Sequence, residues 1–394
     1  MNINHHPCFN PKACKNHGRV HLPVAPRCNI QCNFCNRKFD CVNESRPGVS
    51  SGILSPDQAM AYLDRVMAEK GNIAVVGIAG PGDPFANPEE TLATLAMTRR
   101  KYPDMLLCLA SNGLNLPDYI DEIAALDVSH VSITINAVDT AIGKKIYSWV
   151  RYGKRSLNPE KGAAILLENQ LTAVEALKAK GIIVKVNTIL LPGINEDHVI
   201  DIAKEMAERN VDLFNCMPYY PNEGANFAHL GEPSKKTVTE VQKAAEAYIP
   251  QMRHCKRCRA DAVGLLDEVE PDTGLMEDLQ ACASLDTSLT QMPGFSPAST
   301  PSSHIAVATR EGVLVNQHLG EADRFSIYDI SGEQPVMVAS RKAAEPGNGD
   351  LRWHSLAGSL QDCRMILVSG AGDSPKKVLK EHGIEVLIVN GLID

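Results

Sequence analysis

The chain has 394 residues, a formal net charge of −8 at pH 7 and 44% hydrophobic residues. This length allows a sizeable core in two or three domains, and the charge gives no basic field that would favour nucleic acid. The start lacks the cationic and apolar regions of a signal peptide, and no apolar run reaches about 18 residues. We therefore expect a cytoplasmic protein that binds neither nucleic acid nor a membrane.

Residues 1–18 carry no periodicity and predict an arm, followed by a short strand near 19–26 that leads into a cysteine-rich loop. Further on, apolar runs of strand length alternate with helical patterns. Helices are predicted at 55–70, 88–101, 118–125, 166–180, 196–209 and 235–248, the first with Ser55 as N-cap and Pro56 at its first position. Strands are predicted at 72–79, 105–110, 128–135, 182–190 and 211–217. The alternation predicts an α/β fold, a parallel sheet curved into a partial (βα)6 barrel of the TIM type, with its chemistry at the carboxyl ends of the strands.

A stretch rich in Ser, Thr and Pro at 286–303 is predicted to be a flexible linker. It separates residues 1–285 from a second, small α/β domain at 304–394, which is within the usual size range of domains. In this second domain, strands are predicted at 304–309, 325–330, 336–340, 365–369 and 386–389, and helices at 354–360 and 375–382.

Twelve cysteines are too few for a disulfide scaffold in so long a chain, and their clustering favours metal binding in a reducing compartment. Cys28, Cys32 and Cys35 form a C-x3-C-x2-C triplet. Three thiolates on one loop can bind three irons of a 4Fe–4S cubane and leave the fourth iron to a small chelator. The alternatives are a zinc knuckle, which usually needs two C-x2-C pairs, or unrelated core cysteines. The triplet resembles the signature of radical S-adenosylmethionine (SAM) enzymes, in which the open iron binds the amino and carboxylate groups of SAM.

Gly80-Pro81-Gly82-Asp83-Pro84 ends the second strand. Such a turn lets a ligand approach the backbone closely, and in radical SAM enzymes a glycine-rich segment here binds the amino group of the cofactor. Asp83 would add charge to that contact. A plain tight turn between strand and helix is the alternative.

Polar residues on the next strands are predicted to line a cofactor pocket. Ser132, Thr134 and Asn136 alternate on one strand face, which favours a polar pocket over a dry core. Asn187 ends the following strand before a loop that contains Ile194, and both are expected to close over adenine.

Cys108 and Asn112 share one face of the third strand. Asn112 is expected to meet the cofactor at the strand end. Cys108 would point into the barrel below it, as a metal ligand or as a small core residue.

Cys255 and Cys258 form a C-x2-C pair, which is half a metal site. Cys41 is the nearest candidate to complete it, and a redox dithiol is the alternative. Glu44 and Arg46 follow the cysteine loop and are predicted to reach the substrate, or else to form a surface ion pair.

Longer segments resemble the NifB family, the nitrogenase cofactor maturases. They are His6-Pro7-Cys8-Phe9, Gly18-Arg19-Val20-His21, the run from Cys28 to Gly48, and the run from Cys255 to Leu266. The segment from His304 is similar to the NifX-like domain, a ribonuclease H-like fold that is fused to some members. The resemblance implies fusion of two 4Fe–4S units, with insertion of carbide and sulfur, into NifB-co, the precursor of FeMo-co.

The resemblance also implies SAM and three 4Fe–4S clusters. Cys28, Cys32 and Cys35 would hold the catalytic cluster. The two substrate clusters would be held by Cys8, His21 and Cys108, and by Cys41, Cys255 and Cys258. Implied partners are a cluster donor, a NifB-co carrier or scaffold, and a low-potential electron donor. His318 is a candidate contact for the product cluster, although Leu319 stands where the family usually has Phe.

Two other functions remain as alternatives at the level of sequence. One is a radical SAM peptide-modifying enzyme whose extra cysteines bind auxiliary clusters. The other is a non-catalytic iron–sulfur scaffold or carrier.

Overall fold

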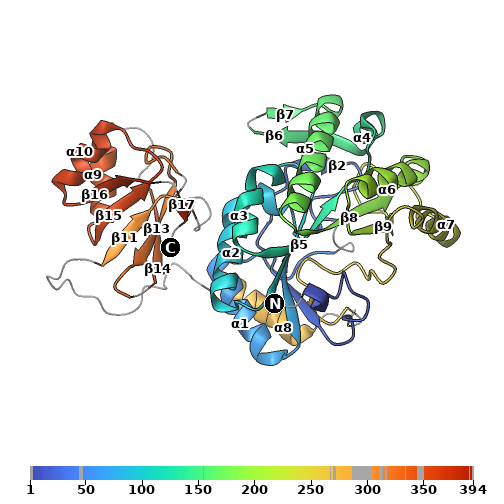
Figure 1. Ribbon diagram of the computed structural model, residues 1–394, viewed down its shortest axis with the longest axis horizontal. Coiled ribbons are helices and arrows are strands. Elements are labelled where there is room, and N and C mark those ends of the chain that lie inside the picture. Colours follow the sequence, from blue (N-terminus) through green and yellow to red (C-terminus); the bar gives the residue numbers. More distant parts are fainter. Residues whose placement is uncertain are drawn as a thin grey trace. The chain divides into compact units, whose positions relative to one another are not determined.

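The computed structural model describes residues 3–43, 48–153, 155–266, 268, 272–285, 303–309, 314–315, 317–332, 334–343, 350–389 and 391–392. The chain divides into two compact units, Met1–Leu285 and Asp286–Asp394 (Figure 1). Residues 286–302, which include all but the last residue of the predicted linker, lie outside the described residues. Across the described part of the chain, no helix is long and apolar enough to cross a membrane.

Seven strands of the described first unit form one sheet. Six of them are parallel, and the seventh, at one edge, is antiparallel to its neighbour. Their spatial order is β10 (Val263–Gly264), β1 (Gly18–His21), β3 (Ile73–Ile78), β4 (Leu106–Ser111), β5 (Val128–Thr134), β8 (Ile183–Leu190) and β9 (Leu213–Pro218). The sheet runs from β10 to β9 as an open, partial barrel, so the predicted fold class is confirmed.

Helices pack along the outer side of this sheet (Figure 1). They are α1 (Pro56–Glu69), α2 (Pro88–Lys101), α3 (Ile120–Ala125), α5 (Pro159–Ala179), α6 (Val199–Glu208), α7 (Lys235–Ala245) and α8 (Thr273–Ala283). Ser55 is the N-cap of α1, and its side chain forms a capping box with Gln58. The sequence placed the start of α5 seven residues too late, because Asn158, whose side chain accepts from Lys161 N, already caps the helix before Pro159.

The segment between β5 and α5 contains regular structure that the sequence did not predict. It folds into α4 (Thr140–Ile146), β6 (Tyr147–Tyr152) and β7 (Arg155–Leu157). β6 pairs with β2 (Ile30–Cys32), a short strand inside the cysteine loop itself. The cysteine loop is therefore one strand of a second, three-stranded sheet in the order β2-β6-β7.

Short 3-10 helices occur at η1 (Ile3–His5) in the N-terminal arm and at η2 (Pro84–Ala86), η3 (Leu116–Tyr119) and η4 (Glu196–His198) elsewhere.

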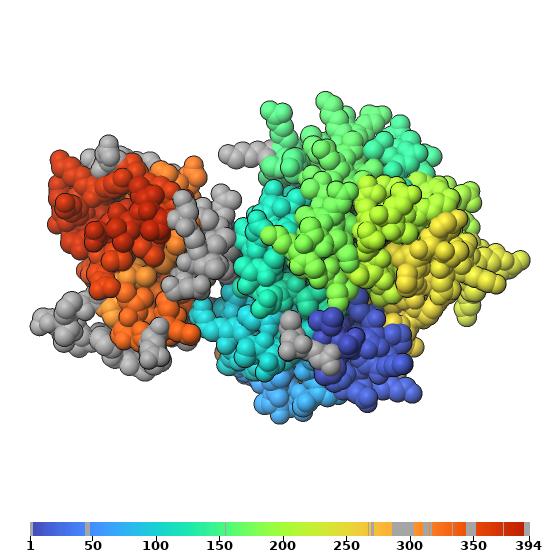
Figure 2. Space-filling view, viewed as in Figure 1, coloured from blue at the N-terminus to red at the C-terminus, as the bar shows by residue number. Residues whose placement is uncertain are grey.

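The N-terminal arm packs against the segment that follows β9. The His254 ring donates from Nε2 to the carbonyl oxygen of Pro7 at 3.0 Å. In Figure 2 the dark blue arm accordingly adjoins yellow residues of the same unit.

The second unit has its own mixed sheet. Its described five-stranded order is β14 (Val336–Lys342), β13 (Arg324–Asp329), β11 (His304–Val307), β15 (Cys363–Val368) and β16 (Glu385–Ile388). In chain order this is 3-2-1-4-5, which agrees with the predicted ribonuclease H-like fold. Helices α9 (Asp350–Ser359) and α10 (Asp373–Glu381) pack on each other, and β12 (Leu314–Val315) pairs with β17 (Gly391–Leu392). Leu319 lies in the core of this unit.

Candidate active site and cluster-binding cavities

The three cysteines of the triplet line one cavity at the carboxyl ends of β3, β4 and β5. We call it the triplet cavity. Its lining residues include Cys28, Cys32, Cys35, Cys41, Asn43, Gly82, Asp83, Ala110, Ser111, Asn112 and Thr134. The loop that carries the triplet is anchored in a hydrophobic core. Its residues Ile30, Cys32 and Phe34 belong to this core, which also includes Tyr147 and Val150.

The thiols of the triplet fit an iron–sulfur cluster. Burial, with a smaller contribution from Asp83, raises the pKa of Cys28 to about 12. Burial also raises the pKa of Cys32, and the neighbouring Cys35 thiol adds to that effect. A thiol binds iron as the thiolate, so iron bound here would replace these protons and compensate the charge of the sulfurs.

Two asparagine side chains point their amides at triplet sulfurs. Asn112 Nδ2 lies 3.9 Å from Cys28 Sγ and also donates to Asn29 Oδ1 at 2.7 Å. Asn43 Nδ2 lies 3.7 Å from Cys32 Sγ. N–H groups directed at cluster sulfurs stabilise negative charge and tune the reduction potential. The role of Asn43 was missed in the sequence, since its side chain meets Cys32 only through the fold of the loop.

Asp83 joins the ends of two strands. Its carboxylate accepts from Asn112 N at 2.6 Å, from Phe85 N at 2.9 Å and from Ser111 Oγ at 3.0 Å. The side chain therefore orients the Asn112 segment of the triplet cavity.

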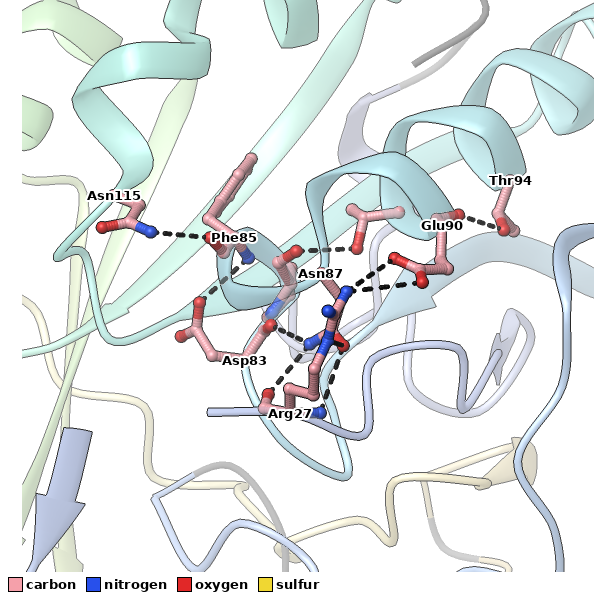
Figure 3. A network of polar contacts seen from close by, with 9 residues as sticks. Arg27, Asp83, Phe85, Asn87, Glu90, Thr94 and Asn115 are labelled. Atoms are coloured by element: carbon pink, nitrogen blue, oxygen red, sulfur yellow. Dashed lines mark hydrogen bonds and ion pairs between the residues drawn. The ribbon is translucent and has the colours of Figure 1, made fainter. Parts of the chain in front are cut away.

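The glycine turn and Asn87 hold the residue that precedes the triplet, and Figure 3 shows the contacts of Asn87 with Arg27 and Asp83. Gly82 N donates to Ala25 O at 2.6 Å, and a Cβ at Gly82 would lie 2.0 Å from Arg27 O, so only glycine fits. Asn87 Nδ2 donates to Arg27 O at 2.9 Å and to Asp83 O at 2.8 Å. The backbone of Arg27 is thus fixed on both sides immediately before Cys28.

A second cavity collects four of the nine cysteines outside the triplet, and we call it the second cavity. Its lining residues include His6, Cys8, Phe9, His21, Gly77, Cys108, Ala110, Ser132, Lys185, Asn187, Asn215, Cys255, Lys256, Arg257 and Cys258. They come from the arm, from β1, β3, β4, β5, β8 and β9, and from the loop after β9. Ala110 lines both cavities.

His21 is prepared to act as a metal ligand. Its Nδ1 lies 3.1 Å from the carbonyl oxygen of Arg259. A carbonyl only accepts, so Nδ1 carries the proton and Nε2 keeps its lone pair. Burial, together with Arg19, lowers the pKa of His21 to about 4 and keeps the ring neutral.

Buried cations border the second cavity, among them Lys185 and Arg19. Lys185, on β8, is 7% exposed, and its Nζ lies 5.4 Å from the centre of the Phe9 ring. Arg19, 3% exposed, donates from Nη1 to Leu265 O at 2.7 Å and from Nη2 to Cys258 Sγ at 3.1 Å. Cations next to several thiols fit an anionic iron–sulfur cluster, because each would offset its charge.

The structure does not bring Cys41, Cys255 and Cys258 together in one of the described cavities. Cys41 lines the triplet cavity, whereas the other two line the second. The two loops are nevertheless joined, because Arg257 donates from Nη2 to the carbonyl of Val42, next to Cys41, and from Nη1 to Pro218 O at 2.9 Å.

Polar residues of β5 and β8 are divided between the two cavities. Thr134 lines the triplet cavity, whereas Ser132 and Asn187 line the second. Asn187 Oδ1 accepts from Asn215 Nδ2 at 3.0 Å, and the same amide lies 3.5 Å from Cys255 Sγ. Asn187 thus orients an amide that faces a cysteine, a role that the sequence did not suggest.

The remaining predicted site residues lie elsewhere. Asn136 lies outside the described cavities; it is buried and accepts from Ile189 N at 2.8 Å. Ile194 packs against the core that contains the cysteine loop. Glu44 and Arg46 lie outside the described residues. Among the described residues, no three Cys, His, Asp or Glu side chains converge on a single metal ion, although a cubane does not require this because each thiolate binds its own iron.

Comparisons with known proteins agree with this arrangement. A family model described as the radical SAM superfamily matches residues 22–206. The open parallel barrel and this match define the class of the protein, which is a radical SAM enzyme. A second model, described as dinitrogenase iron-molybdenum cofactor, matches residues 302–393.

The chain belongs to the NifB family. It is 51% identical over 396 residues to the FeMo cofactor biosynthesis protein NifB of Chlorobaculum tepidum, covering 100% of this chain and 91% of that protein. It is 37% identical to the protein of the same name from Frankia alni, covering 100% of this chain and 86% of that protein. The prediction of a radical SAM enzyme of FeMo-cofactor biosynthesis, which uses an iron–sulfur cluster and SAM, is confirmed, and the peptide-modifying alternative is wrong.

Among solved structures, SuiB of Streptococcus suis bound to S-adenosylmethionine matches with a TM-score of 0.41 and 13% identity, covering 59% of this chain and 50% of that chain.

Proposed function

We propose that the chain fuses two 4Fe–4S clusters, with insertion of carbide and sulfur, into NifB-co, the precursor of FeMo-co. The observation that supports this most directly is the pair of cavities that meet at Ala110. One contains the triplet, and the other contains four cysteines and the neutral His21, with the buried Lys185 among its lining residues and Arg19 in contact with Cys258. A radical formed in the triplet cavity would then lie close to a substrate in the second cavity.

In this proposal Cys28, Cys32 and Cys35 hold the catalytic cluster. When bound there, the cluster and SAM supply a 5′-deoxyadenosyl radical. The protein's contribution is positioning: Asn43 and Asn112 direct amides at triplet sulfurs, and the turn at Gly82 fixes the backbone before Cys28. The turn at Gly80 and Gly82 is proposed to bind the amino group of SAM; Gly82 lines the triplet cavity, and Thr134 adds a hydroxyl to it.

The substrate clusters are proposed to divide between two ligand sets. Cys8, His21 and Cys108, which all line the second cavity, would hold one cluster. Cys41, Cys255 and Cys258 would hold the other, which requires Cys41 of the triplet cavity to approach the loop that Arg257 joins to it. The first set includes an imidazole, which is a weaker ligand for iron than thiolate, so the cluster that it holds should be the more easily released. Lys185 and Arg19 would compensate the negative charge of both substrates.

The proposal assigns residues 1–285 to the radical SAM domain, with the arm and the C-x2-C segment as cluster-binding parts. It assigns residues 304–394 to a NifX-like carrier module, in which His318 contacts the product. The partners would be an iron–sulfur cluster donor, a NifB-co carrier or scaffold protein and a low-potential electron donor.

Iron content measured with electron paramagnetic resonance (EPR) after anaerobic reconstitution tests the proposal. We expect about twelve irons per chain, four for each of three cubanes. Addition of dithionite and SAM should then yield 5′-deoxyadenosine. A protein that holds about four irons, or that yields no 5′-deoxyadenosine and acts only as a carrier, would contradict the proposal.

Gly77→Ala should weaken binding of the cluster that Cys8, His21 and Cys108 are proposed to hold. A Cβ at Gly77 would lie 2.9 Å from His21 Cδ2 and 3.3 Å from Nε2, so the ring must shift. Overpacking of this kind costs about 1–3 kcal/mol, and we expect about four irons to be lost, or held several-fold less tightly, while the triplet cluster remains. Gly71→Ala is the matched control, because a Cβ there meets nothing within 4 Å. Equal iron content in the two variants would argue against His21 as a ligand.

A further inference from the structure

His6 is a second buried imidazole of the second cavity, beside the ligand-ready His21. Its side chain is 2% exposed and lines that cavity together with Cys8. The ring packs edge-on against Phe9, with 4.7 Å between ring centres, and lies 4.4 Å from the ring of His130.

The backbone determines which nitrogen of His6 carries the proton. Cys8 N donates to His6 Nδ1 at 3.2 Å. An accepting Nδ1 is unprotonated, so the proton of the ring lies on Nε2. This Nε2 is buried and has no hydrogen-bond partner among the described residues. A buried donor without a partner is rare in native structures and points to a group that is missing from the protein alone.

His6 and His21, which both line the second cavity, therefore hold their ring protons on opposite nitrogens. His21 keeps a lone pair on Nε2, because its Nδ1 donates to a carbonyl. His6 offers an N–H from Nε2, because its Nδ1 accepts from an amide. Iron binds the lone pair of an imidazole, whereas a cluster sulfur accepts a hydrogen bond.

We propose that His6 donates its Nε2–H to a sulfur of the substrate cluster held by Cys8, His21 and Cys108, and that His21 alone supplies an imidazole ligand to iron. This inference rests on the proposed function, since it requires a cluster in the second cavity. An N–H directed at a cluster sulfur stabilises the more negative, reduced state of the cluster. His6 thus acts as a substrate-positioning residue that also raises the reduction potential of this cluster.

His130 is the competing partner for the same proton. Its Nε2 is also buried without a partner among the described residues, and the two rings are in contact. If one ring turned, His6 could donate to His130 instead of to the cluster. His130 does not line the second cavity, so substitution of each histidine separates the two arrangements.

Electron–nuclear double resonance on the reduced, reconstituted full chain tests the inference. The chain carries Cys28→Ala, Cys32→Ala and Cys35→Ala to remove the signal of the catalytic cluster, with ¹⁵N-labelled histidine and exchange into D₂O. We expect one strongly coupled histidine nitrogen, lost in His21→Ala and kept in His6→Phe. We also expect an exchangeable proton coupling that His6→Phe removes and that His6→Gln, which keeps an amide donor, retains.

The reduced fraction of this cluster at a fixed potential should fall about fivefold in His6→Phe, as for the loss of one hydrogen bond. His130→Phe should change neither the proton coupling nor that fraction. The inference is overturned if His6→Phe removes the strong nitrogen coupling, if it leaves the proton coupling intact, or if His130→Phe has the same effect as His6→Phe.

Loss of the cluster from a His6 variant would also test the donor role of His6. Loss from His6→Phe with retention in His6→Gln supports the donor role, whereas loss from both variants contradicts it. If the triplet-substituted chain with His6 and His21 intact holds no cluster, the proposed function fails. If that cluster is present but does not respond to His6→Phe, only the role of His6 fails.

Discussion

Cys32→Ala should reduce SAM cleavage to 5′-deoxyadenosine by more than about 100-fold, because even changes to residues that merely orient metal ligands cost 10- to 100-fold. The Cys32 thiol is buried between the other triplet cysteines and Asn43, and its loss leaves only two protein ligands for the catalytic cluster. Chromatographic measurement of 5′-deoxyadenosine under dithionite checks the result.

Cys258→Ala should behave differently, because Cys258 lines the second cavity. Independent sites perturb each other by only about 0.3–0.5 kcal/mol, so SAM cleavage should stay within about twofold while formation of the eight-iron product stops. Cys282→Ala is the matched control, since this cysteine is buried in α8 and lines neither described cavity. Equal loss of both activities in the Cys32 and Cys258 variants would mean that the two cavities are not separate reaction and substrate sites.

Lys185→Met should release substrate clusters. At an effective dielectric constant of about 20, two unit charges about 8 Å apart attract each other by about 2 kcal/mol, so we expect roughly 30-fold weaker retention of an anionic cluster. Methionine keeps the length of the buried stem against Phe9 and removes only the charge. Iron retained after gel filtration against a chelator provides the measurement.

Lys101→Met is the control for the Lys185 variant. It removes the same charge from a lysine at the end of α2, where Nζ pairs with Asp64 at 2.6 Å and about half of the side chain is exposed. Its iron content should equal that of the unsubstituted chain. If Lys185→Met retained its iron equally well, charge compensation by Lys185 would not contribute to cluster binding.

The barrel could be predicted from the sequence because each of its strands and helices is indicated by a pattern of neighbouring residues. Alternating apolar runs and helical patterns locate β3, β4, β5, β8 and β9, and the cap at Ser55 is readable within four residues. The short strand β2 could not be predicted, because three residues inside a cysteine loop become a strand only when β6 pairs with them, more than a hundred residues later. The hairpin of β6 and β7 has the same origin in tertiary pairing.

The residues of the candidate site likewise fall into those that the sequence predicts and those that only the fold reveals. The triplet and the C-x2-C pair are readable from spacing alone. Asn43 and Asn215 are not, because an asparagine carries no signal of its own, and their contacts with cysteine sulfurs depend on loops that meet only in the folded chain. The tautomer of His6 likewise depends on one backbone amide.

Ala110 is the penultimate residue of β4, and its single methyl group lines both cavities. The volume of that side chain sets the width of any opening between the place where a radical forms and the place where it is consumed. Serine or glycine would keep such a passage open, whereas leucine or phenylalanine would close it. What matters at position 110 is therefore the volume of the side chain and not its polarity, because a methyl group neither donates nor accepts a hydrogen bond.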